Sequence, residues 1–162
     1  MSRFQQFVSI ARRVRSVARE FERGHGPQTS RRSGRTAPVQ QGTRVEYSPE
    51  LDGDPDPGEV VWTWVPYEDD PSQGKDRPVV IIGRTGDDLA GVQLTSRKKR
   101  RRDLVPVGSG AWDSKRRPSY AKVDRLLRID PDEVRREGAI LDRHRFDDVV
   151  GNLARNFDLV GR

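Results

Sequence analysis

The side chains that could perform chemistry in this sequence are few, which narrows the possible reactions. The chain has 2 histidines, His25 and His144, and no cysteine. A thiol nucleophile, thiolate metal sites and disulfides are therefore excluded. Because His25 lies in a stretch rich in Gly and Pro, and His144 in the first turn of an expected helix, we do not expect two histidines to act together as acid and base. His144 is expected to be a partly exposed helix residue.

Serine and acidic side chains offer no better catalyst. No serine has an adjacent base that would activate its hydroxyl, so the sequence gives no support for a hydrolase triad. The acidic run Glu68-Asp69-Asp70 is followed by Pro71-Ser72-Gln73-Gly74, a composition typical of a flexible loop. Since a hard cation needs several oxygen ligands held in fixed positions, we expect neither a metal nor another cofactor there.

Arginines and hydroxyls at the ends of expected strands remain. A planar guanidinium binds two phosphate oxygens and stabilises charge that grows on them in a transition state. RNA carries its own nucleophile, because a 2′-hydroxyl held in line can attack the adjacent phosphorus. Arg77 opens an apolar strand as Arg77-Pro78, and Thr95-Ser96 closes another. From the residues alone, a structural salt bridge explains Arg77 about as well as phosphoryl chemistry does.

One basic run carries a charge equal to that of the whole chain. The formal net charge is +6, and the run consists of Arg97, Lys98, Lys99, Arg100, Arg101 and Arg102. Such a run is suited to a polyanion, with binding that is directed to phosphates and falls steeply with salt. The alternative is a solvated surface loop.

The first third of the chain predicts one helix and a linker. The first region of the chain is residues 1–23. Within it, residues 3–23 predict a basic amphipathic helix. Its apolar residues recur at heptad spacing, at Phe4, Phe7, Ala11, Val14, Ala18 and Phe21. Docking on a partner, on the protein itself or on an anionic membrane surface is open, as is a helix without a function of its own. Residues 24–57, rich in Gly, Pro, Ser and Thr, predict a disordered linker with one short extended piece at 44–47.

Residues 58–162 predict the folded domain. Strand patterns occur at 60–65, 78–82, 89–94, 103–107 and 120–129. Many short strands joined by tight turns indicate a small barrel of mainly β class with helices (α+β), and not a parallel sheet. Residues 142–158 predict an amphipathic helix over an open side of this barrel, with Asp142 as its N-cap. No apolar run reaches the ~20 residues that a membrane span needs, and no secretory signal is evident, so we expect a cytoplasmic protein.

The segment from Gly58 to Thr95 resembles the start of the PemK/MazF family of toxin ribonucleases. The shared elements are Gly58-Glu59-Val60-Val61-Trp62, Pro66, Gln73-Gly74, Arg77-Pro78-Val79-Val80-Ile81-Ile82 and Thr95-Ser96. Downstream, the stretch from Ser119 to Asp130 and the expected C-terminal helix are also similar to the family. The resemblance covers about residues 58–159 and implies a small SH3-like barrel of the CcdB/MazF type.

The resemblance also implies a reaction and its partners. It implies an endoribonuclease that cleaves single-stranded RNA without metal and leaves a 2′,3′-cyclic phosphate and a 5′-hydroxyl. By position, Arg77 and Thr95 match the catalytic residues of the family, with Ser96 beside them. A homodimer is implied, with RNA in the groove between subunits and a cognate antitoxin that occupies this groove. Ser72 stands where some members place a glutamate, so the acid-base role of that glutamate is missing.

Two further groups of residues are expected to contact nucleic acid. Because the run from Arg97 to Arg102 directly follows Thr95-Ser96, it would draw an RNA strand across the site. Trp112, in a loop of Gly, Ser and Arg residues, is a candidate platform for base stacking, whereas Trp62, Trp64 and Tyr120 are expected to be buried.

Two other functions are open on the same fold. One is a non-catalytic module that binds nucleic acid (DNA or RNA) or a protein partner. The other is a gyrase-directed poison of the CcdB branch. That branch relies on an aromatic residue near the extreme C-terminus, whereas this chain ends Leu159-Val160-Gly161-Arg162. The presence of both Arg77 and Thr95 favours the nuclease.

Overall fold

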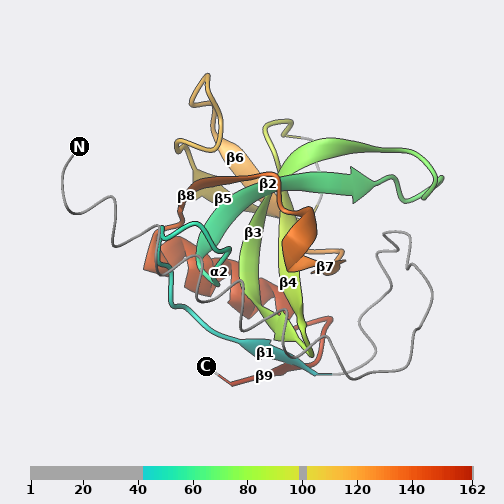
Figure 1. The fold of residues 1–162 in the computed structure, drawn as a ribbon, viewed down its shortest axis with the longest axis vertical. Helices are drawn as coiled ribbons and strands as arrows, with labels where there is room; N and C mark the ends of the chain where they lie inside the picture. The colour runs from blue at the N-terminus through green and yellow to red at the C-terminus, as the bar shows by residue number, and fades with distance from the viewer. Residues whose placement is uncertain (1–41, 99–101, 162) are drawn as a thin grey trace. The chain divides into compact units, whose positions relative to one another are not determined.

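The structure, a computed structural model, describes residues 42–98 and 102–161. In this part of the chain, nine strands form one sheet that curls into a half-barrel around an α-helix (Figure 1). The strands are β1 (Thr43–Val45), β2 (Glu59–Pro66), β3 (Gly74–Thr85), β4 (Asp88–Thr95), β5 (Leu104–Gly108), β6 (Ser119–Lys122), β7 (Leu127–Ile129), β8 (Arg136–Ile140) and β9 (Leu159–Val160). The helices are α2 (Arg143–Leu153) and a short 3-10 helix, η2 (Pro131–Glu133).

The sheet follows the order β5-β6-β4-β3-β1-β9, and further strands pair beside this path. β2 pairs with both β3 and β8, and β7 pairs with β4. All of these pairs are antiparallel except β1 with β9, which lie side by side in parallel at the lower edge in Figure 1. The register shifts between Ile81 and Gly83 where β3 meets β4. Such bulges bend a strand and increase its twist, which curls the sheet.

The central strand β3 packs against a core on each of its faces. Successive side chains of a strand point to opposite faces, so the apolar run from Val79 to Ile82 serves both. Val80 and Ile82 belong to a larger core that includes the buried side of α2. Val79 and Ile81 belong to a smaller core with Leu89 and Leu127. A fully apolar run is therefore required here, which explains why the sequence at this point does not alternate.

The C-terminal helix confirms the predicted amphipathic pattern and its cap. The Asp142 carboxylate accepts hydrogen bonds from the backbone N–H groups of His144 (3.0 Å) and Arg145 (3.4 Å). The helix buries its apolar side chains at Phe146, Val149, Val150 and Leu153. Each such side chain contributes roughly 1.5–3 kcal/mol of hydrophobic stabilisation. The helix ends at Leu153, before the predicted end at residue 158, although Phe157 still packs on the larger core.

Residues 42–57 are part of the folded body, which corrects the prediction that the linker extends to residue 57. Thr43 in β1 is fully buried, and its hydroxyl bonds with the hydroxyl of Thr85 at 2.9 Å. The Tyr47 hydroxyl donates to the carbonyl oxygen of Leu141 (2.9 Å). The short extended piece predicted at 44–47 overlaps β1. A strand of three residues is too short to show a periodic pattern, so its order depends on distant partners. The predicted helix at 3–23 and residues 24–41 of the predicted linker lie outside the described residues.

Several strands differ from the sequence prediction. The stretch predicted as one strand at 120–129 is two strands, β6 and β7, because the chain turns at residues 123–126. β8 and β9 were not predicted. Trp64 is exposed, contrary to the expectation that it is buried, because it lies beyond the part of β2 that packs on the larger core, opposite the exposed Asp76 of β3. In the described part of the chain, no helix is long and apolar enough to span a membrane.

Candidate active site

The candidate site lies where strands β3 and β4 separate. Their register pairs Val79 with Gln93 and stops there. Beyond this pair, β3 continues along β2, with Arg77 opposite Thr63, and β4 continues along β6, with Thr95 opposite Tyr120. Residues of β3 and β4 beyond the last pair line a cavity of about 660 Å³. The fork in the sheet therefore creates the cavity and places both predicted catalytic residues beside it.

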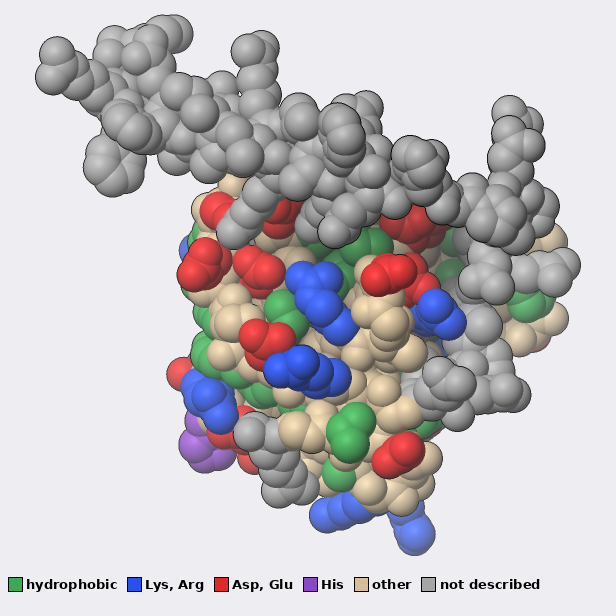
Figure 2. Space-filling model, turned by 60° about the horizontal axis from the view of Figure 1, so that its bottom comes forward, with side chains coloured by type: hydrophobic (Ala, Val, Ile, Leu, Met, Phe, Trp, Pro, Cys, Tyr) green, Lys and Arg blue, Asp and Glu red, His purple; other side chains and the backbone are tan. Residues whose placement is uncertain are grey.

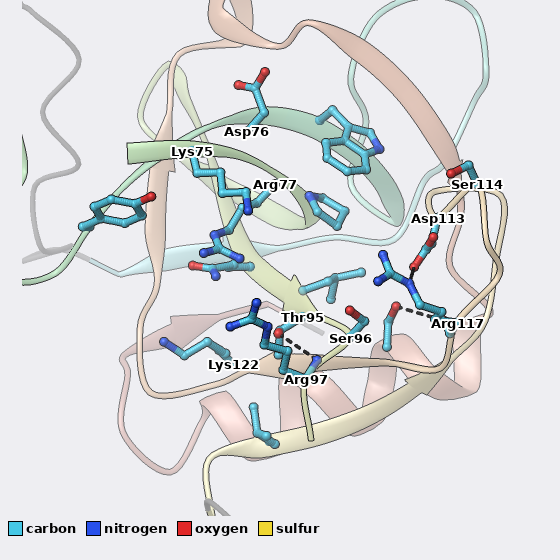
Figure 3. Close-up of a pocket in the computed structure, with 17 residues that line it drawn as sticks. Lys75, Asp76, Arg77, Thr95, Ser96, Arg97, Asp113, Ser114, Arg117 and Lys122 are labelled. Carbon is cyan, nitrogen blue, oxygen red and sulfur yellow. Dashed lines mark hydrogen bonds and ion pairs between the residues drawn. The ribbon is translucent and has the colours of Figure 1, made fainter. Parts of the chain in front are cut away.

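Alternation along the two strands explains which side chains line this cavity. Arg77 lies two residues before Val79, and Thr95 lies two residues after Gln93. Side chains two positions apart on a strand point to the same face, so Arg77 and Thr95 lie on the face that carries the pair Val79 and Gln93. Val79 belongs to the smaller core, and the polar side chains that line the cavity lie beyond the end of that core. Figure 3 shows Arg77 and Thr95 in one cavity, Arg77 on β3 and Thr95 on β4.

The Thr95 hydroxyl is oriented by its own turn. Its Oγ1 atom accepts a hydrogen bond from the backbone N–H of Arg97 at 3.1 Å. A hydroxyl that accepts from the backbone keeps its own hydrogen to donate. Ser96 also lines the cavity. The turn after β4 therefore offers a hydrogen-bond donor on the side of the cavity that faces Arg77.

Positive charge predominates in the cavity. The lining cations are Lys75, Arg77, Arg97, Arg117 and Lys122, and the lining carboxylates are Asp76 and Asp113. Both carboxylates are already paired, Asp76 with Arg135 (3.2 Å) and Asp113 with Arg117 (2.8 Å). Lys122 pairs with Glu68 (2.8 Å).

Three of the lining cations have no carboxylate partner among the described residues. Lys75, Arg77 and Arg97 form no ion pair with any residue in the described ranges 42–98 and 102–161. Cations gathered in a concave site attract anions. With a hydroxyl donor among them, these groups are suited to binding a phosphate.

Comparison with known proteins places the chain in a family. The model of PemK-like, MazF-like toxins of type II toxin–antitoxin systems matches residues 56–157. The chain belongs to this family. The match begins after β1, so β1 lies outside the part of the chain that the family model matches. No curated protein is significantly similar to the sequence.

The fold is similar to that of a solved MazF structure. MazF from Deinococcus radiodurans is 20% identical, with a TM-score of 0.52, and the match covers 63% of this chain and 94% of that one. The toxin MazF-mt6 of Mycobacterium tuberculosis is 18% identical, with a TM-score of 0.48 and coverage of 64% and 99%. At such identities the Deinococcus structure supports the fold, a mainly β curled sheet with one helix.

Within this PemK/MazF-like fold, Trp112 is buried, which corrects its prediction as a stacking platform. Its side chain is only 3% exposed and belongs to the larger core. The indole N–H donates to the hydroxyl of Ser119 (3.1 Å), and the Trp112 carbonyl accepts from the indole of Trp62 (3.0 Å). Gly110 has no Cβ, so the indole can fold against its backbone. Trp62 is half-buried and lines the cavity.

The basic run after Thr95 is only partly described. Arg97 lines the cavity, while Lys98 and Arg102 are exposed. Lys99, Arg100 and Arg101 lie outside the described residues.

Three lining cations, Lys75, Arg117 and Lys122, were not predicted. Lys75 could have been found, because it stands two residues before Arg77 on the same strand. Arg117 and Lys122 gave no comparable signal, because the loop and the strand that carry them are distant in the sequence.

In the acidic loop before β3, the carboxylate of Asp70 accepts hydrogen bonds from neighbouring residues of the same loop. Asp70 accepts hydrogen bonds from the hydroxyl and backbone N–H of Ser72 (2.6 and 3.1 Å) and from the Gln73 amide (2.9 Å). The Ser72 hydroxyl bond, followed by the Ser72 backbone bond, holds the pKa of Asp70 below its ordinary value. Among the described residues, Glu50, Asp52 and Asp56 bring carboxylate oxygens within 4.8 Å of one another. None of these three lines the cavity.

Proposed function

We propose that this protein is a toxin endoribonuclease that cleaves single-stranded RNA at a phosphodiester held between Arg77 and Thr95. The observation that carries the proposal is that a guanidinium and an oriented hydroxyl line one cavity with an excess of positive charge. Membership of the PemK/MazF-like toxins supplies the reaction class. The fork between β3 and β4 makes the site accessible to an extended strand.

The proposed reaction uses the RNA's own nucleophile. The 2′-oxygen attacks the adjacent phosphorus while the bond from phosphorus to the 5′-oxygen breaks, leaving a 2′,3′-cyclic phosphate and a 5′-hydroxyl. The 2′-hydroxyl gives its proton to water, and the leaving 5′-oxygen takes one from water or from Arg77. No metal ion takes part.

Each site residue has a defined role in this reaction. Since the pKa of arginine exceeds ~12, Arg77 acts mainly by stabilising negative charge on the phosphoryl oxygens. Thr95 donates a hydrogen bond to one of those oxygens. Ser96 and Arg97, next along the chain, hold the phosphate beside this pair.

The family also suggests how the activity is controlled. Toxins of type II systems are held inactive by a protein antitoxin, and the family description places this chain among them. We propose a cognate antitoxin whose extended segment covers the cavity, and a cytoplasmic homodimer that presents two such sites.

The test is cleavage of long single-stranded RNA in the presence of a chelator, with the new ends mapped. We expect 5′-hydroxyl ends in the wild type, and a loss of about 10²–10³-fold or more in rate for Arg77→Ala and for Thr95→Val. Arg84→Ala is the control, since Arg84 lies on the same strand but pairs with Asp56 (3.7 Å) outside the cavity. Salt-sensitive binding without cuts would replace the nuclease with a non-catalytic nucleic-acid-binding module.

A further inference from the structure

Arg117 lines the same cavity from an element that neither catalytic residue belongs to. It lies in the loop between β5 and β6, whereas Arg77 and Thr95 come from β3 and β4. In Figure 3, Arg117 extends from this loop toward the interior, across the cavity from Lys75 and Arg77. A strand that passes between Arg77 and Thr95 would therefore meet a second guanidinium on the other wall.

The loop holds Arg117 in place through Asp113. The Nε–H of Arg117 donates to Asp113 Oδ2 at 2.8 Å, and Asp113 Oδ1 accepts from the backbone N–H of Lys115 at 2.9 Å. The backbone carbonyl of Asp113 accepts from Arg116 N–H (2.8 Å). Buried Trp112, the residue before Asp113, anchors the loop in the core. The anchored carboxylate thus fixes the arginine, which reduces the ordering that a ligand would otherwise impose.

The two side chains differ in exposure, because Asp113 is nearly buried and Arg117 stays accessible to a ligand in the cavity. The side chain of Asp113 is only 10% exposed, whereas that of Arg117 is 56% exposed. Asp113 contacts the guanidinium through Nε, so its two terminal nitrogens stay available. Among the described residues, no other group bonds to this guanidinium. Two parallel N–H groups of a guanidinium match two non-bridging oxygens of a phosphate.

We infer that Arg117, held by Asp113, binds an RNA phosphate neighbouring the scissile one. This inference rests on the proposed function, because it takes the scissile phosphate to lie between Arg77 and Thr95. Ligand cavities of a few hundred Å³ enclose molecules much larger than one phosphate, and this cavity is of about 660 Å³. The strand is thereby gripped at two phosphates, and Asp113 is a positioning residue.

The test is a scan in which single phosphates of a bound strand are neutralised as methylphosphonates. The probe is an RNA of about eight nucleotides with a 2′-deoxy sugar at the mapped cleavage position, or oligouridylate of that length if no cut is found. In the wild type, neutralising one phosphate next to the scissile one is expected to weaken binding about tenfold. In Arg117→Gln, neutralising that same phosphate is expected to cause no further loss of binding affinity.

Two other variants distinguish an effect at one phosphate from a general loss of charge or structure. Arg116→Gln removes an adjacent exposed cation that does not line the cavity, and it should keep the wild-type pattern. In Asp113→Asn, neutralising that same phosphate should cause a smaller loss of affinity than in the wild type. If the substitution only disturbed the structure of the loop, binding would instead be weaker with every modified strand. Circular dichroism verifies that each variant is folded.

The inference would be overturned if neutralising each phosphate reduced the affinity of Arg117→Gln by the same factor as that of the wild type. Wild-type affinity of Arg117→Gln for the unmodified strand would overturn it as well, and would leave an acidic protein segment as the ligand for Arg117. Because the scan measures binding, it is independent of cleavage. A protein that makes no cuts but shows the coupling at one phosphate would refute the proposed nuclease and retain this phosphate site.

Discussion

Lys75, Arg77 and Arg97 are arranged in a way that folding alone does not explain. Like charges gathered in one cavity repel one another, and none of the three has an ion-pair partner among the described residues. Lys75 and Arg97 are exposed to solvent and Arg77 is half-buried, so all three are accessible, and a concave cluster of cations attracts anions. At this scale, the site resembles a phosphate-binding surface more closely than an acid-base pair.

Asp124 offers a pH-dependent test near the cavity. Partial burial, then a hydrogen bond with Asp103, raises the pKa of Asp124 above its ordinary value, although nearby Lys122 lowers it. Since the folded state binds this proton more tightly, ionisation at neutral pH lowers the free energy of unfolding. Asp124→Asn should therefore stabilise the protein at pH 7, by less than about 1 kcal/mol because the group is partly exposed.

Urea unfolding at two pH values provides the measurement. At about pH 3, below the ordinary pKa of aspartate, Asp124 is largely protonated in both the folded and the unfolded state, so the advantage of Asp124→Asn should nearly vanish there. It should grow as the pH rises from there through the raised pKa of Asp124. An advantage of equal size at about pH 3 and pH 7 would contradict this account.

The sequence predicted the central residues of the site but not its outer wall. Arg77 and Thr95 stand in a recognisable order at the ends of strands, and the structure places both in the cavity. Arg117 is part of the cavity only because Asp113 and buried Trp112 fix its loop. Such contacts join residues of an irregular loop, so no periodic pattern reveals them. For the same reason the sequence left Trp112 as a candidate stacking platform, although it is buried.

At the scale of elements, the contact between β1 and β3 depends on one glycine. Gly83 is buried opposite Val45, and a Cβ there would overlap the backbone carbonyl of Arg44. Because a backbone carbonyl cannot move aside as a flexible side chain does, Gly83→Ala should lower the free energy of unfolding by about 1–3 kcal/mol.

Gly151 provides a matched control with the opposite sign. It lies in α2, and a Cβ there would meet nothing within 4 Å. Gly151→Ala should therefore stabilise the helix by about 0.5–1 kcal/mol. Urea unfolding of both variants measures the difference. Equal stability of Gly83→Ala and wild type would show that β1 moves away from β3 without loss.

The elements that the sequence predicted are those with patterns of their own. The strands at Glu59–Pro66, Gly74–Thr85 and Asp88–Thr95 and the helix at Arg143–Leu153 carry long apolar or periodic runs. β1 and β9 have three and two residues. Their order comes from pairing with each other and with β3, which depends on the tertiary fold and not on local sequence.

At the scale of the whole molecule, positive charge is concentrated in two stretches of the sequence, residues 1–41 with a formal charge of +7 and the run at 97–102 with +6. The face turned forward in Figure 2 shows Lys and Arg side chains interspersed with Asp and Glu side chains. Lys75, Arg77 and Arg97, which have no ion-pair partner in the described part of the chain, line the cavity, and Arg97 begins the run whose charge equals the net charge of +6. A strand attracted by the run would thus be delivered to the site.

Replacing residues 97–102 with glutamine tests this arrangement. Each phosphate that a protein neutralises on a single strand contributes about −0.7 to the slope of log K against log salt. The variant should bind all RNA sequences more weakly, and its slope should be shallower by about 0.7 for each phosphate that the run neutralises in the wild type. The measurement is a fluorescence anisotropy titration at several salt concentrations, with a control in which exposed Arg145 and Arg155, which do not line the cavity, become glutamine. An unchanged slope would mean that the run is a solvated loop that neutralises no phosphate.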